Sequence, residues 1–240
     1  MDLLQRKSII VITAISCCLS YCNTSNKESM QPIDGYQMLR SKEEILQALK
    51  DKCVDTIKIK KGEIIADIGA GNGELEAMLS MFYDSLIFFI QDIDSMVCNQ
   101  KAIDKVVADY QGVNNKPFTN KFIAVNGSDI ETNLPDDTFD KILMLWTYQY
   151  LKKPRDLLMD IRQKLKQEGL FYVINPDVDE KDGKMLTLKH GWNASPIEKE
   201  ISDIIGCGFE LIRISRNNDG PDQPYIMVFK KKNLIKFCVP

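Results

Sequence analysis

The chain has 240 residues, of which 44% are hydrophobic and 27% are charged. This apolar content can build one sizeable core, so the composition excludes a mainly disordered protein, and the length is too short for two comfortable domains. Lysine and arginine total 31 against 34 aspartates and glutamates, which gives a net charge of −3. The basic excess typical of proteins that bind nucleic acid is missing, so we expect no nucleic-acid partner. The single histidine, His190, excludes a histidine-rich metal site within one chain.

Residues 1–22 have the pattern of an export signal. Arg6 and Lys7 precede an apolar run over 8–20, which is shorter than the roughly 18 apolar residues that a membrane-spanning helix needs. The segment Leu19-Ser20-Tyr21-Cys22 resembles a bacterial lipobox, in which the cysteine is lipidated and becomes the new N-terminus. We therefore expect an exported lipoprotein that is attached to a membrane through Cys22.

Other interpretations of the leader remain open. Cys17 and Cys18 are alternative lipidation sites, and an uncleaved anchor or a start at Met30 would give different N-termini. The start at Met30 corresponds to a cytoplasmic protein. We expect residues 23–40 to form a tether and 41–240 to form the folded domain.

The cysteines give no sign of a metal or redox site. Four lie beyond the leader, and none of them has a C-x-x-C spacing: Cys53, Cys98, Cys207 and Cys238. We expect them to be buried as small hydrophobic residues. The acidic stretch 177–183 does not meet the requirements of a calcium loop, because Lys181 and Asp182 stand where a ligand and a glycine are needed. No metal site is predicted.

Helices and strands alternate along the domain. Ser41 and Glu44 form a capping box for a helix over 42–52, and Asp94 is the predicted N-cap of a helix that reaches 108. Pro154 begins a helix whose apolar face includes Leu165, and Ser195-Pro196 opens another, with Pro196 at its first helical position. One further helix is expected over 74–82, and strands are expected over 63–68, 86–90, 122–125, 139–145 and 170–174.

The last two strands, 209–215 and 225–230, are joined by a turn that is too short for a crossover helix, so they should be antiparallel. The order amounts to five β–α alternations followed by a hairpin. This pattern predicts an α/β domain with a mostly parallel sheet and helices on both of its faces.

A glycine-rich turn follows the first strand, in the segment Asp67-Ile-Gly69-Ala-Gly71-Asn-Gly73. Glycines let the backbone turn tightly and let a ligand approach, and the following helix offers free N–H groups. The dinucleotide pattern G-x-G-x-x-G would need a glycine where Glu74 stands, and a carboxylate there would sit badly beside a pyrophosphate. On its own, the glycine-rich turn is weak evidence for a ligand-binding site.

Two acids strengthen the evidence for a ligand-binding site. Asp92 ends the second strand, where a carboxylate can accept hydrogen bonds from two ribose hydroxyls, although Asp94 is a competing candidate. Asp129 follows the third strand, where it could accept from an adenine amino group or serve as a turn residue.

With these residues, the chain resembles the class I S-adenosylmethionine-dependent methyltransferases that act on small molecules. The resemblance covers about 63–230 and includes three further segments: Leu134-Pro-Asp-Asp-Thr-Phe-Asp140, Lys164-Leu-Lys-Gln-Glu-Gly-Leu170 and Ile205-Gly-Cys-Gly-Phe-Glu-Leu211. It implies a Rossmann-like seven-stranded sheet of order 3-2-1-4-5-7-6 with the last strand antiparallel. It also implies S-adenosylmethionine as the cofactor and a small-molecule substrate.

The resemblance assigns cofactor roles to ten residues. Asp67, Gly69, Gly71 and Gly73 would hold the methionine part, and Asp92 the ribose. Ser128, Asp129 and Ile130 would frame the adenine, whereas Leu145 and Trp146 would lie beside the sulfonium.

The acceptor side is less defined. Tyr148, Tyr150 and His190 are candidates to line it, each with packing or surface exposure as the alternative role, and no catalytic residue is assigned. The long stretch from 177 to 194 could cover the acceptor pocket. Because the cofactor is made in the cytoplasm and the leader suggests export, a second hypothesis stays open. It is an exported, lipid-anchored domain that binds a nucleoside-like ligand or a partner without catalysis.

Overall fold

The computed structural model describes residues 41–52, 54–176, 196–216 and 224–232. The chain divides into the units Met1–Arg40 and Ser41–Pro240, and all described residues belong to the second unit. Cys22, His190, Ser195 and the loop over 177–194 therefore lie outside the described residues. In the part that is described, no helix is long and apolar enough to cross a membrane.

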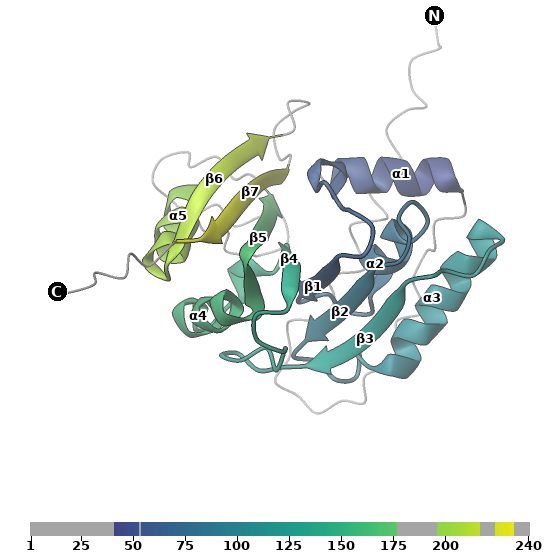
Figure 1. Cartoon of the computed structure of the whole chain (residues 1–240), viewed down its shortest axis with the longest axis horizontal. Helices are drawn as coiled ribbons and strands as arrows, with labels where there is room; N and C mark the ends of the chain where they lie inside the picture. The colour runs from purple at the N-terminus through teal and green to yellow at the C-terminus, as the bar shows by residue number, and fades with distance from the viewer. Residues whose placement is uncertain (1–40, 53, 177–195, 217–223, 233–240) are drawn as a thin grey trace, which may run out of the picture. The chain divides into compact units, whose positions relative to one another are not determined.

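The centre of the domain is a seven-stranded sheet of order β3-β2-β1-β4-β5-β7-β6 (Figure 1). The first five strands run parallel, and β7 is antiparallel to both of its neighbours, β5 and β6. This order and the antiparallel strand confirm the predicted fold class. The strands are β1 (Ile64–Ile68), β2 (Ile87–Asp92), β3 (Lys121–Asn126), β4 (Phe139–Leu145), β5 (Leu165–Pro176), β6 (Phe209–Arg216) and β7 (Pro224–Lys231).

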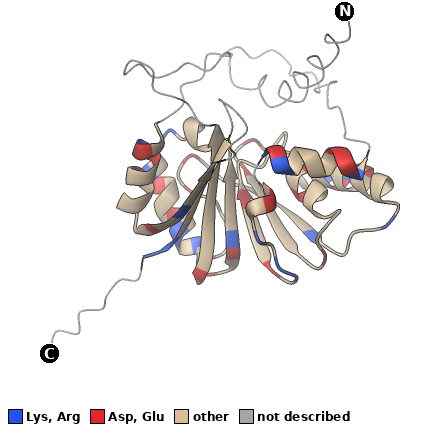
Figure 2. Ribbon diagram, turned by 90° about the horizontal axis from the view of Figure 1, so that it is seen from above, with Lys and Arg blue, Asp and Glu red and all other residues tan. Residues whose placement is uncertain are grey.

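Helices lie on both sides of this sheet (Figure 2). One group packs around α2 (Glu74–Leu79), which contacts α1 (Lys42–Asp51) and α3 (Gln100–Asn114). The other group consists of α4 (Pro154–Lys164) and α5 (Ile197–Gly206), which contact each other. Alternate residues of each strand face one group, because side chains in a strand point to opposite faces in turn. Two short 3-10 turns complete the described elements: η1 (Val54–Thr56) and η2 (Tyr148–Tyr150).

The face covered by α4 and α5 has a core rich in aromatic side chains. Phe171, Phe209 and Phe229 are fully buried, and their ring centroids lie 5.4–6.5 Å apart. Such offset and tilted pairs stabilise a core beyond the area that they bury. They join strands β5, β6 and β7 and so fix the hairpin to the parallel part of the sheet.

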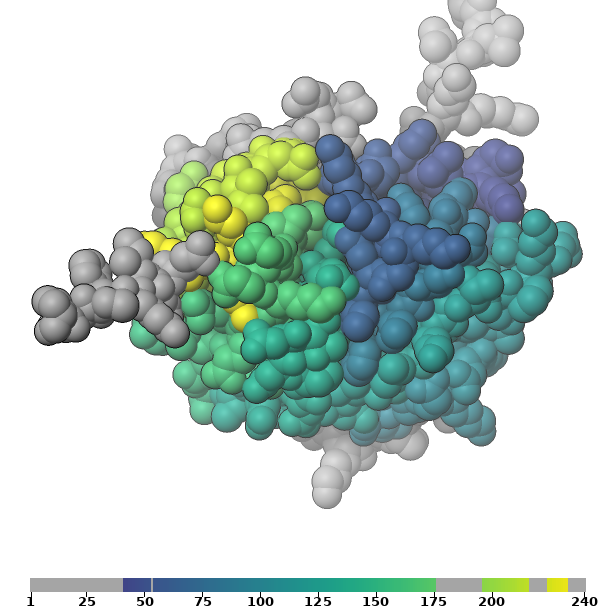
Figure 3. All heavy atoms as spheres, in the orientation of Figure 1, coloured from purple at the N-terminus to yellow at the C-terminus, as the bar shows by residue number. Residues whose placement is uncertain are grey.

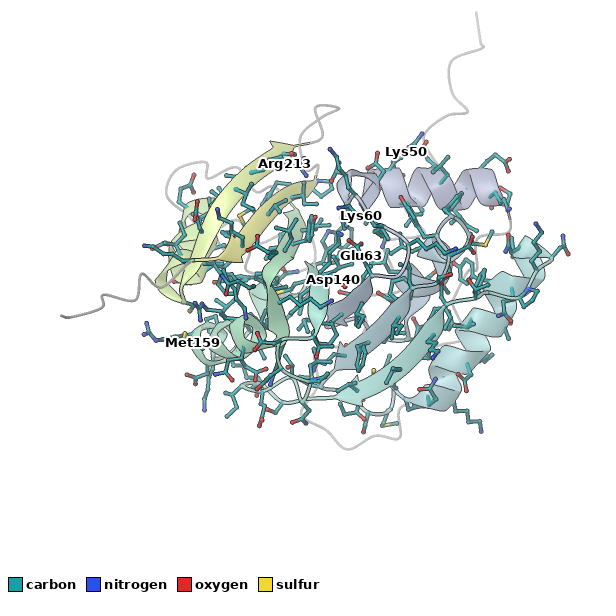
Figure 4. All side chains as sticks on the ribbon, viewed as in Figure 1. Lys50, Lys60, Glu63, Asp140, Met159 and Arg213 are labelled. Atoms are coloured by element: carbon teal, nitrogen blue, oxygen red, sulfur yellow. The ribbon has the colours of Figure 1, made fainter. Side chains whose placement is uncertain are left out.

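The signature segment 134–140 secures the amino end of β4. The Asp140 carboxylate accepts a hydrogen bond from the backbone N–H of Ile64 (2.9 Å) and another from Lys166 (2.7 Å). Burial alone would raise the pKa of Asp140, but these two hydrogen bonds lower it below its ordinary value. Lys141 pairs beside them with Glu63, and both side chains are largely buried. Glu63 and Asp140 lie next to each other in Figure 4.

These contacts give the signature a structural role. In the space-filling view of Figure 3, the dark blue segment that leads into β1 lies against the green segment of β4 and β5. The Asp140 carboxylate thus holds the start of β1 against β4, at the end of the sheet opposite the glycine-rich turn.

Four predicted details are wrong. Helix α3 begins at Gln100, and its N-cap is Asn99, whose side chain accepts from the backbone N–H of Ala102 (3.0 Å). Asp94 instead closes a local turn, because its carboxylate accepts from the backbone N–H of Met96 (2.9 Å). Helix α5 begins at Ile197, so Pro196 is its N-cap and not its first helical residue.

The third and fourth differences concern the alternation of helices and strands. Leu165 starts β5 and does not extend α4, and the connection over 127–138 between β3 and β4 contains no helix. The capping box of α1 is confirmed, since Ser41 and Glu44 exchange hydrogen bonds of 3.1 and 3.2 Å.

Candidate cofactor site

The carboxyl ends of the parallel strands are joined by backbone hydrogen bonds. The N–H groups of Gly69 and Ala70 donate to the carbonyl of Gln91 (2.8 and 3.0 Å), which ties the end of β1 to β2. Gly127 N–H donates to the Asp92 carbonyl (3.1 Å) and ties the loop after β3 to β2. The turns that follow β1, β2 and β3 therefore meet at one edge of the sheet, which is where open α/β sheets bind ligands.

The three glycines of the turn after β1 have positive φ angles of 73°, 61° and 79°. A Cβ on Gly69 would lie 2.4 Å from the Thr147 side chain, and one on Gly73 would lie 2.7 Å from Ile90. A Cβ on Gly71 would meet no atom closer than 3.9 Å, the distance to Val97. Gly69 and Gly73 are thus required by packing, whereas Gly71 leaves open space for a ligand to approach the backbone.

Asp92 is fixed against this turn. One carboxylate oxygen accepts from the backbone N–H of Gly71 (3.0 Å), and the other accepts from that of Asp94 (2.9 Å). The residue is half-buried, and each carboxylate oxygen can accept a further hydrogen bond. Of the two competing acids, the structure places Asp92 beside the glycines and engages Asp94 in its own turn.

Asp67 and Glu76 form a buried carboxyl pair beneath the glycine turn. Asp67 is 4% exposed and Glu76 is 0% exposed, and within the described residues Asp67 Oδ1 and both Glu76 oxygens have no hydrogen-bond partner. Burial, and then the neighbouring Glu76 charge, hold the pKa of Asp67 well above its ordinary value. Burial also raises the pKa of Glu76 to about 7. The pair therefore favours a protonated form near neutral pH.

Glu76 was not predicted from the sequence to belong to the site. The available signal was its position inside the run Leu75–Leu79, whose other members are apolar. Every residue of α2 after Glu74 is buried, so this part of the helix has no solvated face for a charge, and an acid within it calls for an explanation.

The predicted adenine-framing residues lie in the loop after β3. The Ser128 hydroxyl accepts from the backbone N–H groups of Ile130 (3.3 Å) and Glu131 (3.1 Å) and so shapes a tight turn. Asp129 forms an exposed ion pair with Lys152 (3.1 Å). Ile130 is 44% exposed, which leaves an apolar side chain available at this edge.

The end of β4 presents Leu145 and Trp146. Trp146 has a φ of 53°, and its indole nitrogen Nε1 is buried without a partner within the described residues. The ammonium of Lys52 lies 5.3 Å from the ring centroid, a distance typical of a cation–π contact. The backbone N–H of Trp146 donates a hydrogen bond to the backbone carbonyl of Ile174 (2.7 Å), which aligns the ends of β4 and β5.

The candidates for the acceptor side differ in their surroundings. Tyr148 is 3% exposed and belongs to the core beneath α4 and α5, where its hydroxyl donates to Asp203 (3.0 Å). Burial and this hydrogen bond raise the pKa of Tyr148, so its placement favours the packing role. Tyr150 is 39% exposed, and His190 lies outside the described residues.

A second buried polar cluster was not predicted. Glu200 of α5 accepts from the Asn175 amide (3.0 Å to each oxygen) and from the Tyr225 hydroxyl (2.8 Å). Burial raises the pKa of Glu200 to about 7. The cluster joins α5 to the ends of β5 and β7. Within the described ranges, no group of three histidine, cysteine or acidic residues could hold a metal ion.

Comparisons with known proteins agree with this arrangement. A family model described as a methyltransferase domain matches residues 66–173. A SAM-dependent methyltransferase from Aquifex aeolicus has a TM-score of 0.57 at 14% identity, and the match covers 79% of this chain and 97% of that one. No curated protein matches the sequence.

Two other solved structures widen the comparison. A chain from the complex between the Haloferax volcanii Trm112 methyltransferase activator and a methyltransferase has a TM-score of 0.57 at 12% identity, covering 80% of this chain and 94% of that one. The cyclase SpnF has a TM-score of 0.54 at 12% identity, covering 80% of this chain and 81% of that one. The solved structures show that the fold is shared, and the methyltransferase-domain match indicates S-adenosylmethionine as the cofactor.

The residues at the carboxyl edge fit this cofactor. The space at Gly71 admits a ligand beside the backbone, and the Asp92 carboxylate can accept from hydroxyl groups. The unpartnered atoms of Asp67, Glu76 and Trp146 offer acceptors and a donor that an amino acid and nucleoside ligand could satisfy.

Alanine substitutions at Gly71 and Gly73 test whether each glycine is needed for ligand binding or for packing. Gly71→Ala should reduce the stability by about 1–2 kcal/mol, the cost of a left-handed alanine. It should also weaken binding of S-adenosylhomocysteine by at least ~10-fold, because the new methyl group enters the open space. Gly73→Ala should be less stable than Gly71→Ala, because its methyl group also meets Ile90. Denaturant unfolding and calorimetric titration measure both effects, and equal stability of the two variants would contradict this division of roles.

Asp92→Ala should lower the affinity for S-adenosylhomocysteine by at least ~10-fold, because hydrogen bonds to a charged acceptor are worth roughly 1.5–3 kcal/mol each. Asp94→Ala is the matched control, since it removes only the turn contact with Met96 and should bind nearly as the wild type does. The reverse pattern would show that Asp94 is the acid that receives the ribose.

Proposed function

We propose that this protein transfers a methyl group from S-adenosylmethionine to a small-molecule acceptor. The observation that carries the proposal is the Asp92 carboxylate, which the Gly71 N–H holds at the carboxyl edge of the sheet (3.0 Å). This places a hydroxyl-binding acid beside the one glycine of the turn that leaves open space. The match of residues 66–173 to a methyltransferase domain supports the same conclusion.

Each part of the site has a defined task in this proposal. Asp92 accepts the ribose hydroxyls, and the loop of Ser128, Asp129 and Ile130 frames the adenine. Leu145 and Trp146 lie beside the sulfonium, whose positive charge an aromatic face attracts. The methionine part is held by the turn after β1: Asp67, Gly69, Gly71 and Gly73.

S-adenosylmethionine supplies a methyl group that is already activated by its sulfonium. The protein therefore has to bind the cofactor, exclude water and align an acceptor lone pair, and such alignment can supply much of the rate enhancement. A general base is required only if the acceptor must lose a proton. Neither Tyr148, whose hydroxyl is bound to Asp203, nor another described residue is assigned that role.

A second candidate is an exported domain that binds a nucleoside-like ligand without transferring a methyl group. The leader sequence favours keeping it, because an exported domain would be separated from the cytoplasm, where the cofactor is made. Methyl transfer is the stronger candidate because the family match covers the strands that carry the glycine turn, Asp92 and Trp146.

Calorimetry of the full-length protein in detergent tests the choice of ligand. S-adenosylmethionine and S-adenosylhomocysteine should bind saturably, and NAD should not, because Glu74 stands where a dinucleotide site needs a glycine. Transfer of a labelled methyl group into a mixture of small metabolites would favour the enzyme over the binding domain. Saturable binding of NAD without a response to either sulfur nucleoside would overturn the proposal.

We also propose that the protein is exported and anchored to a membrane through a lipidated Cys22. The support is the sequence of the leader: Arg6 and Lys7, the apolar run over 8–20 and the lipobox-like Leu19–Cys22. Stable attachment takes more than one acyl chain, so several chains on this cysteine would be required. The alternative is a cytoplasmic protein that starts at Met30 and has direct access to the cofactor.

Expression of the full-length protein in a bacterium tests the anchor. The wild type should partition into the detergent phase, and Cys22→Ala should remain in the aqueous phase, because it lacks the acyl chains. Cys17→Ala and Cys18→Ala are matched controls that should partition as the wild type does. Mass spectrometry that finds an intact Met1, or a soluble protein that starts at Met30, would contradict export.

A further inference from the structure

Glu76 is a buried carboxyl group whose side chain neighbours that of a second acid, Asp67. It is 0% exposed, and both of its oxygens lack a hydrogen bond within the described part of the chain, as does Asp67 Oδ1. A buried polar group without a partner costs free energy, and a buried charge costs considerably more. Within the described residues, none of these three oxygens meets a donor group of another residue, so the two acids can hydrogen-bond to each other only when one of them keeps a proton.

Among the described residues, no positive charge acts on this site. The neighbours whose charge acts on Asp67 are the carboxyl groups of Glu76 and Asp92, and a carboxyl group cannot supply a positive charge. Glu74, the other acid of α2, accepts from the Tyr110 hydroxyl (2.8 Å). The Cys98 thiol donates to the Ile90 carbonyl (3.2 Å), and burial raises its pKa to about 11, so it stays neutral.

A buried pair of acids can exist in two protonation states. It can keep a proton, which relieves the repulsion between two buried carboxylates. It can also release that proton when a cation arrives from outside, because an adjacent positive charge favours the ionised carboxylate. A primary ammonium group matches the second case, since it carries one positive charge and several donors for the unpartnered oxygens.

We propose that Glu76 couples the binding of the cofactor's α-ammonium group at Asp67 to the release of one proton. This inference rests on the proposed function, which places the methionine part of S-adenosylmethionine at Asp67. In the free protein the pair holds a proton. When the ammonium group binds, one carboxyl O–H bond breaks, the proton leaves to the buffer, and the Asp67 carboxylate pairs with the ammonium group. Glu76 acts through Asp67 and is therefore a positioning residue.

Calorimetric titration of the full-length protein tests this coupling. S-adenosylhomocysteine carries the α-ammonium group, whereas 5′-methylthioadenosine keeps the nucleoside and lacks the amino acid part. Titrations in two buffers of different ionisation enthalpy count the protons that are released. With S-adenosylhomocysteine, the wild type should release up to one proton, and its affinity should rise with pH between about pH 6 and 8, by at most about tenfold per pH unit. With 5′-methylthioadenosine, neither effect should occur.

Glu76→Gln keeps the size of the side chain and removes the second acid. This variant removes the repulsion by Glu76 but leaves the burial of Asp67, which also raises the pKa of Asp67. Proton release and the pH dependence of S-adenosylhomocysteine affinity should therefore both fall below those of the wild type. A purely structural role for Glu76 would change stability and leave the proton count unaltered. Asp67→Asn should lower the affinity for S-adenosylhomocysteine by at least ~10-fold and leave that for 5′-methylthioadenosine nearly unchanged.

The outcomes separate this inference from the proposed function. If the wild type binds neither nucleoside, the proposed function fails and the coupling fails with it. If the wild type binds S-adenosylhomocysteine without proton release, or if both nucleosides release the same number of protons, only the coupling is overturned. The comparison of the two nucleosides uses wild-type protein alone, so it remains decisive even if a variant does not fold.

Discussion

The hydrogen bond from the Gly71 N–H to the Asp92 carboxylate joins the two elements on which the site depends. It fixes the turn after β1 to the end of β2, and Gly127 extends the connection to the loop after β3 through the Asp92 carbonyl. The sheet order places these strand ends side by side, because β1 lies beside β2 and β2 beside β3. A single carboxylate thereby shapes the glycine turn while it keeps acceptor capacity for a ligand.

Much of the fold could be predicted from the sequence because its signals are local. The apolar run over 86–90 predicts a buried parallel strand, and the short loop before 225 predicts the antiparallel strand β7. The position of Asp92 at the end of β2 follows from the same pattern. The sheet order itself was implied by the resemblance, and the structure confirms that order.

The remaining features depend on contacts that are distant in the sequence or on competing local signals. Both Asp94 and Asn99 are suitable helix caps, and the structure uses Asn99 because Asp94 is engaged by Met96. The pairing of Glu76 with Asp67 joins a residue of α2 to a residue of β1 across the glycine turn. The cluster of Asn175, Glu200 and Tyr225 assembles from three separate segments, and nothing in their local sequence indicates that they meet.

The structure of the full-length protein in complex with S-adenosylhomocysteine is the most direct test of the account. We predict that the ribose hydroxyls donate to the Asp92 carboxylate, that the ligand passes the open side of Gly71, and that the α-ammonium group faces Asp67. A ribose held by Asp94, or a ligand bound away from the carboxyl ends of β1, β2 and β3, would contradict it.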